Sequence, residues 1–463
     1  MAVIILGNGA NLSVSDDSSS GDTIILGNGA NDMVAAAHSQ NDVIILGGGA
    51  GNTVNAASSQ NDVIILGGGR NTSVSADNGN GDMIILGNGA NDSVSAASSQ
   101  YDMIILGNGA ADSVNLSGGS TGSQYDSITL GDGAGDNVSL FGLFVGSQYD
   151  TIALGNGARD TVNLGAALND TIILGNGAGD AVYTSPASPF LGLGSNSSTI
   201  ILGGGAGDIV SLEGGSGNTI TLGNGAGDSV TASGADFGVS GNTITLGNGD
   251  RDSVSVSAGG SGASDNTISI GDGAHDSVDL FRAASETVKV GNGAGDTVSS
   301  VDSGGAIWVG NGNGDVVSIS YSVGVTISVG NGNGDVVNDS GSGDTITLGN
   351  GADTVTAGSG STITLGNGAD TVTAIGSLIN GGHGYDTFVF TGSFAEDTVT
   401  NFSPAHDNIV LAQAVFGNFG AMQHDIAQVG ANTVITDPQN SANVITLTNI
   451  KTSSLHASDF QFV

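Results

Sequence analysis

The sequence predicts an all-β protein, a parallel β-solenoid of about 18 coils with a β-rich C-terminal module. Two observations support this prediction. A glycine-led phrase recurs at nearly constant spacing along most of the chain, and each copy contains two short runs of alternating apolar and polar residues. No stretch shows the 3.6-residue apolar period of an amphipathic helix. Two short strands per repeat, separated by turns rich in Gly, Ser and Asn, fit one coil of a solenoid better than the hairpins of a β-sandwich.

The repeat is clearest in the phrase IILGNGANDMVAA at residues 24–36, whose leading glycine occurs 18 times. The leading glycines are Gly7, Gly27, Gly47, Gly67, Gly87, Gly107, Gly131, Gly155, Gly175, Gly203, Gly223, Gly247, Gly271, Gly291, Gly310, Gly330, Gly349 and Gly366. Their spacing is mostly 20 residues, rises to 28 in the middle and falls to 17–19 near the end. We expect the longer spacings to contain surface loops, at 115–125, 140–146 and 185–194.

Alternation within a copy predicts which side chains form the core. Ile24 and Leu26 of one strand, and Val34 and Ala36 of the other, should point inward, whereas Ile25 should point outward. Successive coils would stack equivalent strands about 4.8 Å apart. The core is then a thin stack of Ile, Leu, Val and Ala, with one layer per coil.

The composition changes near the end of the repeat array. Glycine becomes rarer, and eight of the 13 phenylalanines lie beyond residue 380. We therefore divide the chain into solenoid repeats at 1–375 and a C-terminal module at 376–463, which would cap the solenoid.

Charge and composition exclude several classes of protein. Lys and Arg number 6 against 44 Asp and Glu, so the formal net charge of −38 excludes nucleic acid or an anionic membrane as a direct partner. No run reaches the roughly 18 apolar residues of a transmembrane helix. The absence of cysteine excludes disulfides and thiolate metal sites. A mean hydropathy of +0.14 is nevertheless too high for a disordered acidic chain, so an ordered core must form and its acid must be neutralised.

More than half of the acidic residues fall into two regular ladders. Fifteen of the 18 copies carry an Asp four or five residues after the leading glycine, and a second series precedes the other strand. The first ladder is Asp32, Asp92, Asp112, Asp136, Asp160, Asp180, Asp208, Asp228, Asp252, Asp276, Asp296, Asp315, Asp335, Asp353 and Asp370. The second is Asp22, Asp42, Asp62, Asp82, Asp102, Asp126, Asp150, Asp170 and Asp344. Stacked one coil apart, neighbouring carboxylates would repel by about 3–4 kcal/mol at an effective dielectric constant of 20.

Two interpretations of the ladders stay open. Bound cations would neutralise the repulsion, and hard oxygen ligands from carboxylates and glycine-turn carbonyls indicate Ca²⁺ rather than a transition metal. Alternatively, the Asp side chains only accept hydrogen bonds from turn amides. We favour calcium for the first ladder. For the second ladder we give the two interpretations equal weight, because its turns are often rich in Ser and Gln. Leu12, Asn52 and Thr72 replace the first-ladder Asp, so the first coils should bind calcium poorly.

A series of asparagines follows the leading glycines and should form a structural amide stack along the turn. Its members are Asn8, Asn28, Asn88, Asn108, Asn156 and Asn176.

The end of the repeat array resembles the RTX family of calcium-binding β-rolls. Residues 381–389, GGHGYDTFV, match the nonapeptide G-G-x-G-x-D-x-U-x in full, and residues 365–373 and 348–356 match all but its first glycine. The upstream copies read G-N-G-A-x-D, which is one residue longer than the RTX turn. Residues 380–463, with GGHGYDTFVF, EDTVTNFSPAHDNIVL and LHASDFQFV, are similar to the C-terminal domain of RTX proteins that leave the cell by type I secretion.

This resemblance implies a right-handed parallel β-roll with calcium between successive turns, an uncleaved C-terminal export signal and an extracellular or cell-surface location. In the family, the sixth-position Asp carboxylate and the carbonyls of the glycine turn are the ligands. The resemblance gives this role to Asp353, Asp370 and Asp386, to Gly382 and Gly384, and to Asn367 and Gly368 of the preceding copy.

The sequence contains no recognisable catalytic motif. No two of the six histidines have metal-ligand spacing, and no G-x-S-x-G nucleophile motif occurs. Asp pairs that could serve as acid and base occur only as copies of the repeat. Because the repeats and the export-like module occupy the chain, we expect that it is not an enzyme.

We expect instead a secreted, calcium-dependent structural protein that self-assembles into an extracellular layer, fibre or biofilm matrix. Its self-association face would be an outward apolar stripe made of Ile5, Ile25, Ile45, Ile65, Ile85 and Ile105. The alternative is a monomeric calcium-stabilised adhesin or surface-binding module, with a cell-surface polysaccharide or ice as its partner. Outward Thr pairs such as Thr219/Thr221 and Thr345/Thr347 motivate the ice-binding version.

Overall fold

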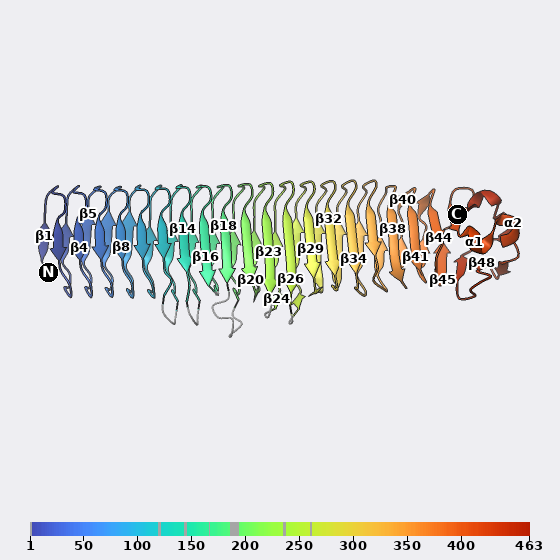
Figure 1. The fold of residues 1–463 in the computed structure, drawn as a ribbon, viewed down its shortest axis with the longest axis horizontal. Helices are drawn as coiled ribbons and strands as arrows, with labels where there is room; N and C mark the ends of the chain where they lie inside the picture. Colours follow the sequence, from blue (N-terminus) through green and yellow to red (C-terminus); the bar gives the residue numbers. More distant parts are fainter. Residues whose placement is uncertain are drawn as a thin grey trace. The chain divides into compact units, whose positions relative to one another are not determined.

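The computed structural model describes residues 2–118, 122–142, 146–165, 167–185, 194–234, 238–259 and 262–463. The fold is a parallel β-solenoid of about nineteen turns that is nearly all β, as the sequence predicts. Two compact units are distinguished, Met1–Gly249 with Ala258–Gly262, and Asp250–Ser257 with Ala263–Val463. Within each unit, equivalent strands follow one another in sequence order (Figure 1). The loops expected at 115–125, 140–146 and 185–194 lie partly outside the described residues.

In the first unit, each coil contributes one strand to sheet A and one to sheet B. Sheet A contains β1 (Val3–Ile5), β3 (Thr23–Ile25), β5 (Val43–Leu46), β7 (Val63–Leu66), β9 (Met83–Leu86), β11 (Met103–Ile105), β13 (Ser127–Thr129), β15 (Thr151–Ala153), β17 (Thr171–Ile173), β19 (Thr199–Ile201), β22 (Thr219–Thr221) and β25 (Thr243–Thr245). Sheet B contains β2 (Ser13–Ser15), β4 (Met33–Ala35), β6 (Thr53–Asn55), β8 (Ser73–Ser75), β10 (Ser93–Ser95), β12 (Ser113–Asn115), β14 (Asn137–Leu140), β16 (Thr161–Gly165), β18 (Ala181–Ser185), β20 (Ile209–Glu213) and β23 (Ser229–Gly234). Short strands β21 (Gly215–Ser216) and β24 (Val239–Ser240) pair beside them.

The second unit repeats this arrangement. Its sheet A strands are β28 (Thr267–Ile270), β31 (Glu286–Val290), β33 (Gly305–Val309), β35 (Thr326–Val329), β37 (Thr345–Thr347), β39 (Thr362–Thr364), β42 (Leu378–Asn380), β45 (Glu396–Thr400), β47 (Ile426–Val429), β48 (Asn432–Thr436) and β49 (Val444–Leu447). Its sheet B strands are β26 (Ser253–Ala258), β29 (Ser277–Phe281), β32 (Thr297–Val301), β34 (Val316–Ser320), β36 (Val336–Asp339), β38 (Thr354–Ser359), β41 (Thr371–Ile375), β44 (Thr387–Phe390), β46 (Asn408–Leu411) and β50 (Phe460–Phe462). Two short pairs complete the unit, β27 (Ala263–Ser264) with β30 (Ala283–Ala284), and β40 (Asn367–Gly368) with β43 (His383–Gly384).

The core is the predicted stack of aliphatic layers. The repeat strands pair in parallel, so that Ile24 of β3 lies opposite Ile44 of β5, and the register shifts within the pair β38–β41, between Thr356 and Ser359. Ile24, Leu26, Val34 and Ala36 are all at most 2% exposed, which confirms the inward positions predicted from alternation.

The last part of the second unit departs from the repeat. Strands β47, β48 and β49 form an antiparallel meander whose last strand pairs in parallel with β45, while β50 pairs in parallel with β46. Between β46 and β47 lie two short helices, α1 (Gln413–Phe416) and α2 (Phe419–Met422), and two 3₁₀ turns follow β49, η1 (Thr452–Ser454) and η2 (Ala457–Asp459). The helices were not predicted, because four residues are too few to show a helical period.

In the described part of the chain, no helix has the length and apolar character that crossing a membrane requires.

Candidate functional site

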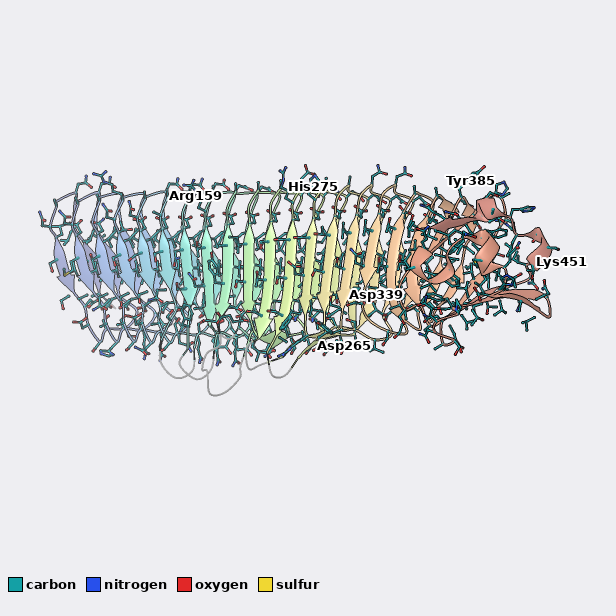
Figure 2. All side chains as sticks on the ribbon, turned by 45° about the vertical axis from the view of Figure 1, so that its right-hand side comes forward. Arg159, Asp265, His275, Asp339, Tyr385 and Lys451 are labelled. Atoms are coloured by element: carbon teal, nitrogen blue, oxygen red, sulfur yellow. The ribbon has the colours of Figure 1, made fainter. Side chains whose placement is uncertain are left out.

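The turn that carries the first ladder directs each Asp side chain inward. In the copies up to Asp335, the residue before the Asp adopts a left-handed backbone conformation, with φ of 64° at Arg159, 75° at Gly179 and 64° at His275. The shorter turns before Asp353, Asp370 and Asp386 do not use this conformation. Arg159 and His275 therefore lie exposed at the turn (Figure 2). The following residues, Asp160 and Asp276, are fully buried. This conformation explains why Gly and Asn are frequent at this position of the repeat.

Main-chain hydrogen bonds link first-ladder carboxylates of successive coils. The main-chain N–H of Asp92 donates to Oδ1 of Asp112 at 2.9 Å, and the N–H of Asp112 donates to Oδ1 of Asp136 at the same distance. Equivalent bonds join Asp136 to Asp160, and Asp296 to Asp315. The ladder residues are at most 1% exposed: Asp32, Asp92, Asp112, Asp136, Asp160, Asp180, Asp208, Asp228, Asp252, Asp276, Asp296, Asp315, Asp335, Asp353, Asp370 and Asp386.

The second carboxylate oxygen is unpartnered in most members of this ladder. Oδ2 is buried and has no hydrogen-bond partner in Asp32, Asp92, Asp112, Asp136, Asp160, Asp180, Asp208, Asp276, Asp296, Asp315, Asp335, Asp353, Asp370 and Asp386. A Cβ atom added to Gly109 would overlap the carbonyl oxygen of Gly89 and lie 2.7 Å from Oδ2 of Asp112. The unpartnered oxygen therefore faces the glycine turn and the carbonyl of the preceding coil. A buried acceptor without a donor is unfavourable unless a proton or a cation satisfies it.

Asn52 occupies the ladder position in one early coil. Its Oδ1 accepts from the N–H of Asp32 at 3.0 Å, as an Asp would, and its Nδ2 donates to the carbonyl oxygen of Gly47 at 3.5 Å. The amide nitrogen of Asn52 thus forms a hydrogen bond from the position that Oδ2 occupies in the coils with Asp. We still expect this coil to bind calcium poorly, and the amide also lowers its need for a cation.

The second ladder is bonded differently. Its Oδ1 atoms also accept main-chain N–H groups, for example that of Asp42 at Asp62. Serine hydroxyls, however, donate to the Oδ2 atoms of several members: Ser19 to Asp42, Ser39 to Asp62, Ser59 to Asp82, Ser123 to Asp150 and Ser147 to Asp170. Oδ2 of Asp102, Asp126 and Asp344 has no partner. For the members with a serine donor, the hydrogen-bonding interpretation fits the geometry better than calcium.

Burial raises the pKa of most ladder carboxyls. Desolvation is the largest cause, and the neighbouring carboxylates add to it. The pKa rises to about 7 at Asp112 and Asp386, and to about 8 at Asp126 of the second ladder. By contrast, hydrogen bonds from the main chain and side chain of Asn156 lower the pKa of Asp132, which lies exposed in the asparagine stack.

Both ladders extend beyond the residues predicted from the repeat. The N–H of Asp386 donates to Oδ1 of Asp407 at 3.1 Å, and the N–H of Ser377 donates to Oδ1 of Asp397 at 2.7 Å. Glu286 takes a second-ladder position, where Oε2 accepts from the N–H of Asn266 at 2.7 Å. The sequence does contain a signal for Glu286 and Asp397. Each lies directly before Thr-Val, in ETV at 286–288 and DTV at 397–399, and both phrases match DTI in the repeats.

The glycines chosen from the RTX resemblance lie where coils stack most closely. The Gly368 carbonyl accepts from the N–H of Tyr385 at 3.0 Å, and a Cβ at Gly384 would overlap that same carbonyl oxygen. Gly382 has a φ of 64°. Asn367 is separate from the buried ladder, because it lies exposed and bonds to Asn350.

The asparagine stack has the predicted structure. The N–H of Asn28 donates to Oδ1 of Asn8, and that of Asn108 to Oδ1 of Asn88, both at 2.9 Å. The stack is exposed and internally bonded, which is consistent with a structural role.

The predicted self-association residues form one continuous column on the outward face of sheet A. Register pairing joins Ile5, Ile25, Ile45, Ile65, Ile85 and Ile105. Beside it runs a second column of Val3, Thr23, Val43, Val63, Met83 and Met103. Ile5 is 66% exposed, and the other Ile residues are half-buried. We call these two columns the apolar face. They contain no charged residue, and they end at β13, where Ser127 and Thr129 follow.

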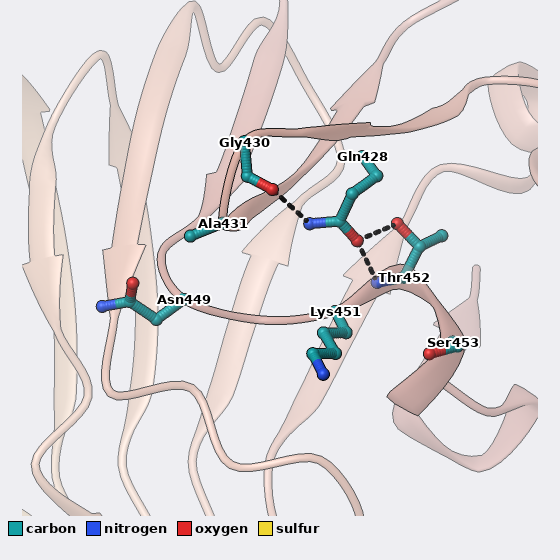
Figure 3. A pocket seen from close by; sticks show the side chains of 7 residues that line it. All are labelled: Gln428, Gly430, Ala431, Asn449, Lys451, Thr452 and Ser453. Carbon is teal, nitrogen blue, oxygen red and sulfur yellow. Dashed lines mark hydrogen bonds between the residues drawn. The ribbon is translucent and has the colours of Figure 1, made fainter.

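Two pockets lie in the C-terminal region of the second unit. One has a volume of about 530 Å³ and is lined by Gln428, Gly430, Ala431, Asn449, Lys451, Thr452 and Ser453 (Figure 3). Gln428 spans it, accepting from the N–H and hydroxyl of Thr452 at 2.8 and 3.0 Å. The other, of about 280 Å³, borders the RTX-like turn and is lined by Gly382, His383, Gly384, Asn401, Ser403, His406 and Asp407.

Within the described ranges, no three His, Asp or Glu side chains gather into a metal-binding group. The ladder presents one carboxylate per coil, so a cation there would take carboxylates from neighbouring coils together with carbonyl oxygens. No protein-family model matches the chain, and a search of curated proteins likewise finds no match.

Proposed function

We propose that this protein is a secreted, calcium-dependent structural solenoid that self-assembles into an extracellular layer, fibre or biofilm matrix. The observation that carries the calcium requirement is the column of buried, unpartnered Oδ2 atoms in the first ladder. The six Lys and Arg residues are too few to neutralise 44 acidic residues, so the charge must be compensated from solution.

The donor set of the first ladder fits a hard cation. Carboxylate Oδ2 atoms from adjacent coils and main-chain carbonyls of the glycine turn are the oxygen ligands that Ca²⁺ takes in proteins. Residues from Asp92 to Asp386 would hold the ions, with Asp353, Asp370 and Asp386 supported in addition by the RTX resemblance. Bound calcium would supply positive charge between coils that otherwise repel one another.

Calcium would then control folding. Without it, the carboxylates must be protonated or remain unpartnered, and the stack is destabilised. Millimolar extracellular calcium can fill weak sites, so the chain would fold fully after export. Secretion by a type I pathway is part of the proposal and rests on the C-terminal resemblance alone.

The apolar face supports self-association. It spans six successive coils of sheet A without a charge, on a chain whose net charge is −38. A contiguous apolar surface of this kind is typical of a protein–protein interface. A second copy of the same face would match its lack of charge.

A monomeric adhesin remains the alternative, and one observation favours a polysaccharide partner. Tyr101, Tyr125 and Tyr149 lie exposed in one turn column, with ring centroids 5.1 and 5.0 Å apart and rings 3° from parallel. Exposed aromatic side chains offer both apolar area and a hydroxyl for binding. The ice-binding version is weaker, because in the described part of the first unit the Thr-x-Thr pattern occurs in only two neighbouring strands, β22 and β25.

Negative-stain electron microscopy in chelator and in a few millimolar Ca²⁺ tests the proposal, with circular dichroism on the same samples. Filaments or sheets that appear only with calcium would support it. Dispersed particles that fold on adding calcium would favour the adhesin. Equal β-structure and stability in chelator and calcium at neutral pH would contradict the calcium requirement.

A further inference from the structure

One aspartate of the second unit lies where the core should be apolar. Asp339 is the last residue of β36, and it takes an inward position in the column that contains Leu280, Ser300 and Ile319. Asp339 is 3% exposed, and Figure 2 labels it. Burying a carboxylate in such a layer is strongly unfavourable unless a positive charge or a proton accompanies it.

A second buried carboxylate lies in the same turn. Asp344 precedes β37 and is 1% exposed. Each carboxylate has one satisfied oxygen: Oδ1 of Asp339 accepts from the N–H of Gly341 at 2.7 Å, and Oδ1 of Asp344 accepts from the N–H of Val325 at 2.6 Å. Oδ2 of both residues is buried without a partner.

Gly341 lies between the two carboxylates, and its lack of a side chain lets three oxygens approach its Cα atom closely. A Cβ atom at Gly341 would lie 2.5 Å from the carbonyl oxygen of Ser322, 2.6 Å from Oδ2 of Asp344 and 2.9 Å from Oδ1 of Asp339. Three oxygens, two of them carboxylate, thus border the space that a side chain would fill. At Gly109 of the first ladder, the carbonyl oxygen of the preceding coil would overlap an added Cβ atom, and only one carboxylate oxygen, Oδ2 of Asp112, lies nearby.

The adjacent coils do not share this pair. The register places Ile319 opposite Asp339, and Ser361 opposite Asp344, since Thr345 pairs with Thr362. Repulsion along a ladder therefore does not explain the arrangement; the two charges meet within one turn. Burial, and then the nearby Asp339 carboxylate, raise the pKa of Asp344 to about 6.

We infer that Asp339, Asp344 and the Ser322 carbonyl form a single binding site for one divalent hard cation, with Ca²⁺ as the ligand that fits an all-oxygen donor set. The site differs from the ladders because one turn supplies both carboxylates. It does not depend on calcium binding in the first ladder.

The test compares the number of calcium ions bound by the full-length chain and its variants at pH 7.5, measured by equilibrium dialysis and elemental analysis. Asp339→Ile with Asp344→Ser gives this turn the residues of its neighbours, and Asp344→Asn keeps the acceptor for Val325 while it removes the charge. Both variants should bind one ion fewer per chain than the wild type. The control Asp265→Asn, at an exposed turn, should bind the wild-type number. An unchanged number in both site variants would overturn the inference.

Thermal unfolding in chelator gives an independent readout. The neighbour-like double variant should melt at a higher temperature than the wild type, because two buried carboxylates without a counter-charge are gone. A lower melting temperature in chelator would show that the pair is satisfied without a cation and would also overturn the inference. If only the ladder failed to bind calcium, the wild type would still hold one ion and the variants none, so the two proposals can fail separately.

Discussion

Nδ2 of Asn52 donates to the carbonyl oxygen of Gly47 at 3.5 Å, at the ladder position where most later coils carry an Asp Oδ2 atom. The change from nitrogen to oxygen replaces a donor by an acceptor. The contact with a turn carbonyl then changes from attraction to repulsion unless a proton or a cation lies between the two oxygens. The expected dependence of the solenoid on calcium and on pH comes from this one atom.

Substituting Asn in the first ladder should reduce the need for calcium. In the triple variant Asp112→Asn, Asp136→Asn and Asp160→Asn, each new amide can donate where Oδ2 had no partner. We expect roughly 1–3 kcal/mol of added stability per site in chelator, with a smaller gain on adding calcium. Urea unfolding with and without Ca²⁺ measures both quantities.

Asp302→Asn is the control for this variant, because Asp302 lies exposed at a turn of the second unit. It should leave both unfolding curves unchanged. If the triple variant is less stable than the wild type in chelator, the carboxylates stabilise the calcium-free fold and the cation explanation of Oδ2 is wrong.

Stability without calcium should fall as the pH rises. Burial raises the pKa of Asp160 to about 6, of Asp112 to about 7 and of Asp126 to about 8 in the folded state, so the folded chain binds protons more tightly than the unfolded chain. This stabilisation is complete below the unfolded Asp pKa of about 3.9 and is lost as the pH passes through the raised values. Melting temperatures in chelator should therefore decrease between pH 5 and pH 8.

Calcium should remove most of this pH dependence above pH 6, because the cation then replaces the protons. The same melting series in a few millimolar Ca²⁺ checks this point. A chelator series that is flat or rises with pH would show that the ladder carboxyls are not protonated in the calcium-free fold.

Removing a serine donor should destabilise the second ladder even when calcium is present. Ser39→Ala deletes the hydroxyl that donates to Oδ2 of Asp62 at 2.6 Å and leaves a buried acceptor unsatisfied. The expected loss is about 1–3 kcal/mol. Ser361→Ala is the matched control, since the buried Ser361 hydroxyl donates to the main-chain carbonyl of Gly358 at 3.2 Å. Equal losses in the two variants would argue against a special role for the Ser–Asp contact.

A charge on the apolar face should block assembly while the fold is retained. Ile65→Glu places a carboxylate in the middle of the two columns, where the side chain is only half-buried. We expect wild-type β-structure in calcium but no filaments or sheets, as judged by circular dichroism and electron microscopy. Thr53→Glu, on the outward face of sheet B, should still assemble. If both variants assemble, the contact between copies uses another surface.

The period and alternation of the repeat were sufficient to predict the solenoid and its core, because every coil shows the same alternation of inward and outward residues. They also predicted that the Asp residues stack. They did not show which carboxylate oxygens would have hydrogen-bond partners, because this depends on side-chain orientation. The hydrogen bond from a main-chain N–H one coil away to Oδ1, and the one from the Ser 23 residues before Asp62 to Oδ2, could not be predicted for this reason. Asp339 was overlooked for a different reason, since it occurs in one coil and repeat analysis emphasises what recurs.

The hydrogen bonds of the first ladder all run in one direction. In the second unit, each N–H from Asp252 to Asp386 donates to the carboxylate of the following coil, and the column ends at Asp407, whose Oδ2 accepts from the N–H of Ser403 in its own turn at 2.7 Å. Both oxygens of Asp407 are therefore satisfied, and the Asp N–H of each earlier coil is satisfied by the coil after it. If folding nucleates at this end, each coil that folds next stacks on a coil that is already folded. Folding would then proceed from the C-terminal end toward the N-terminus, opposite to the direction of synthesis. The coil that nucleates folding would be synthesised last.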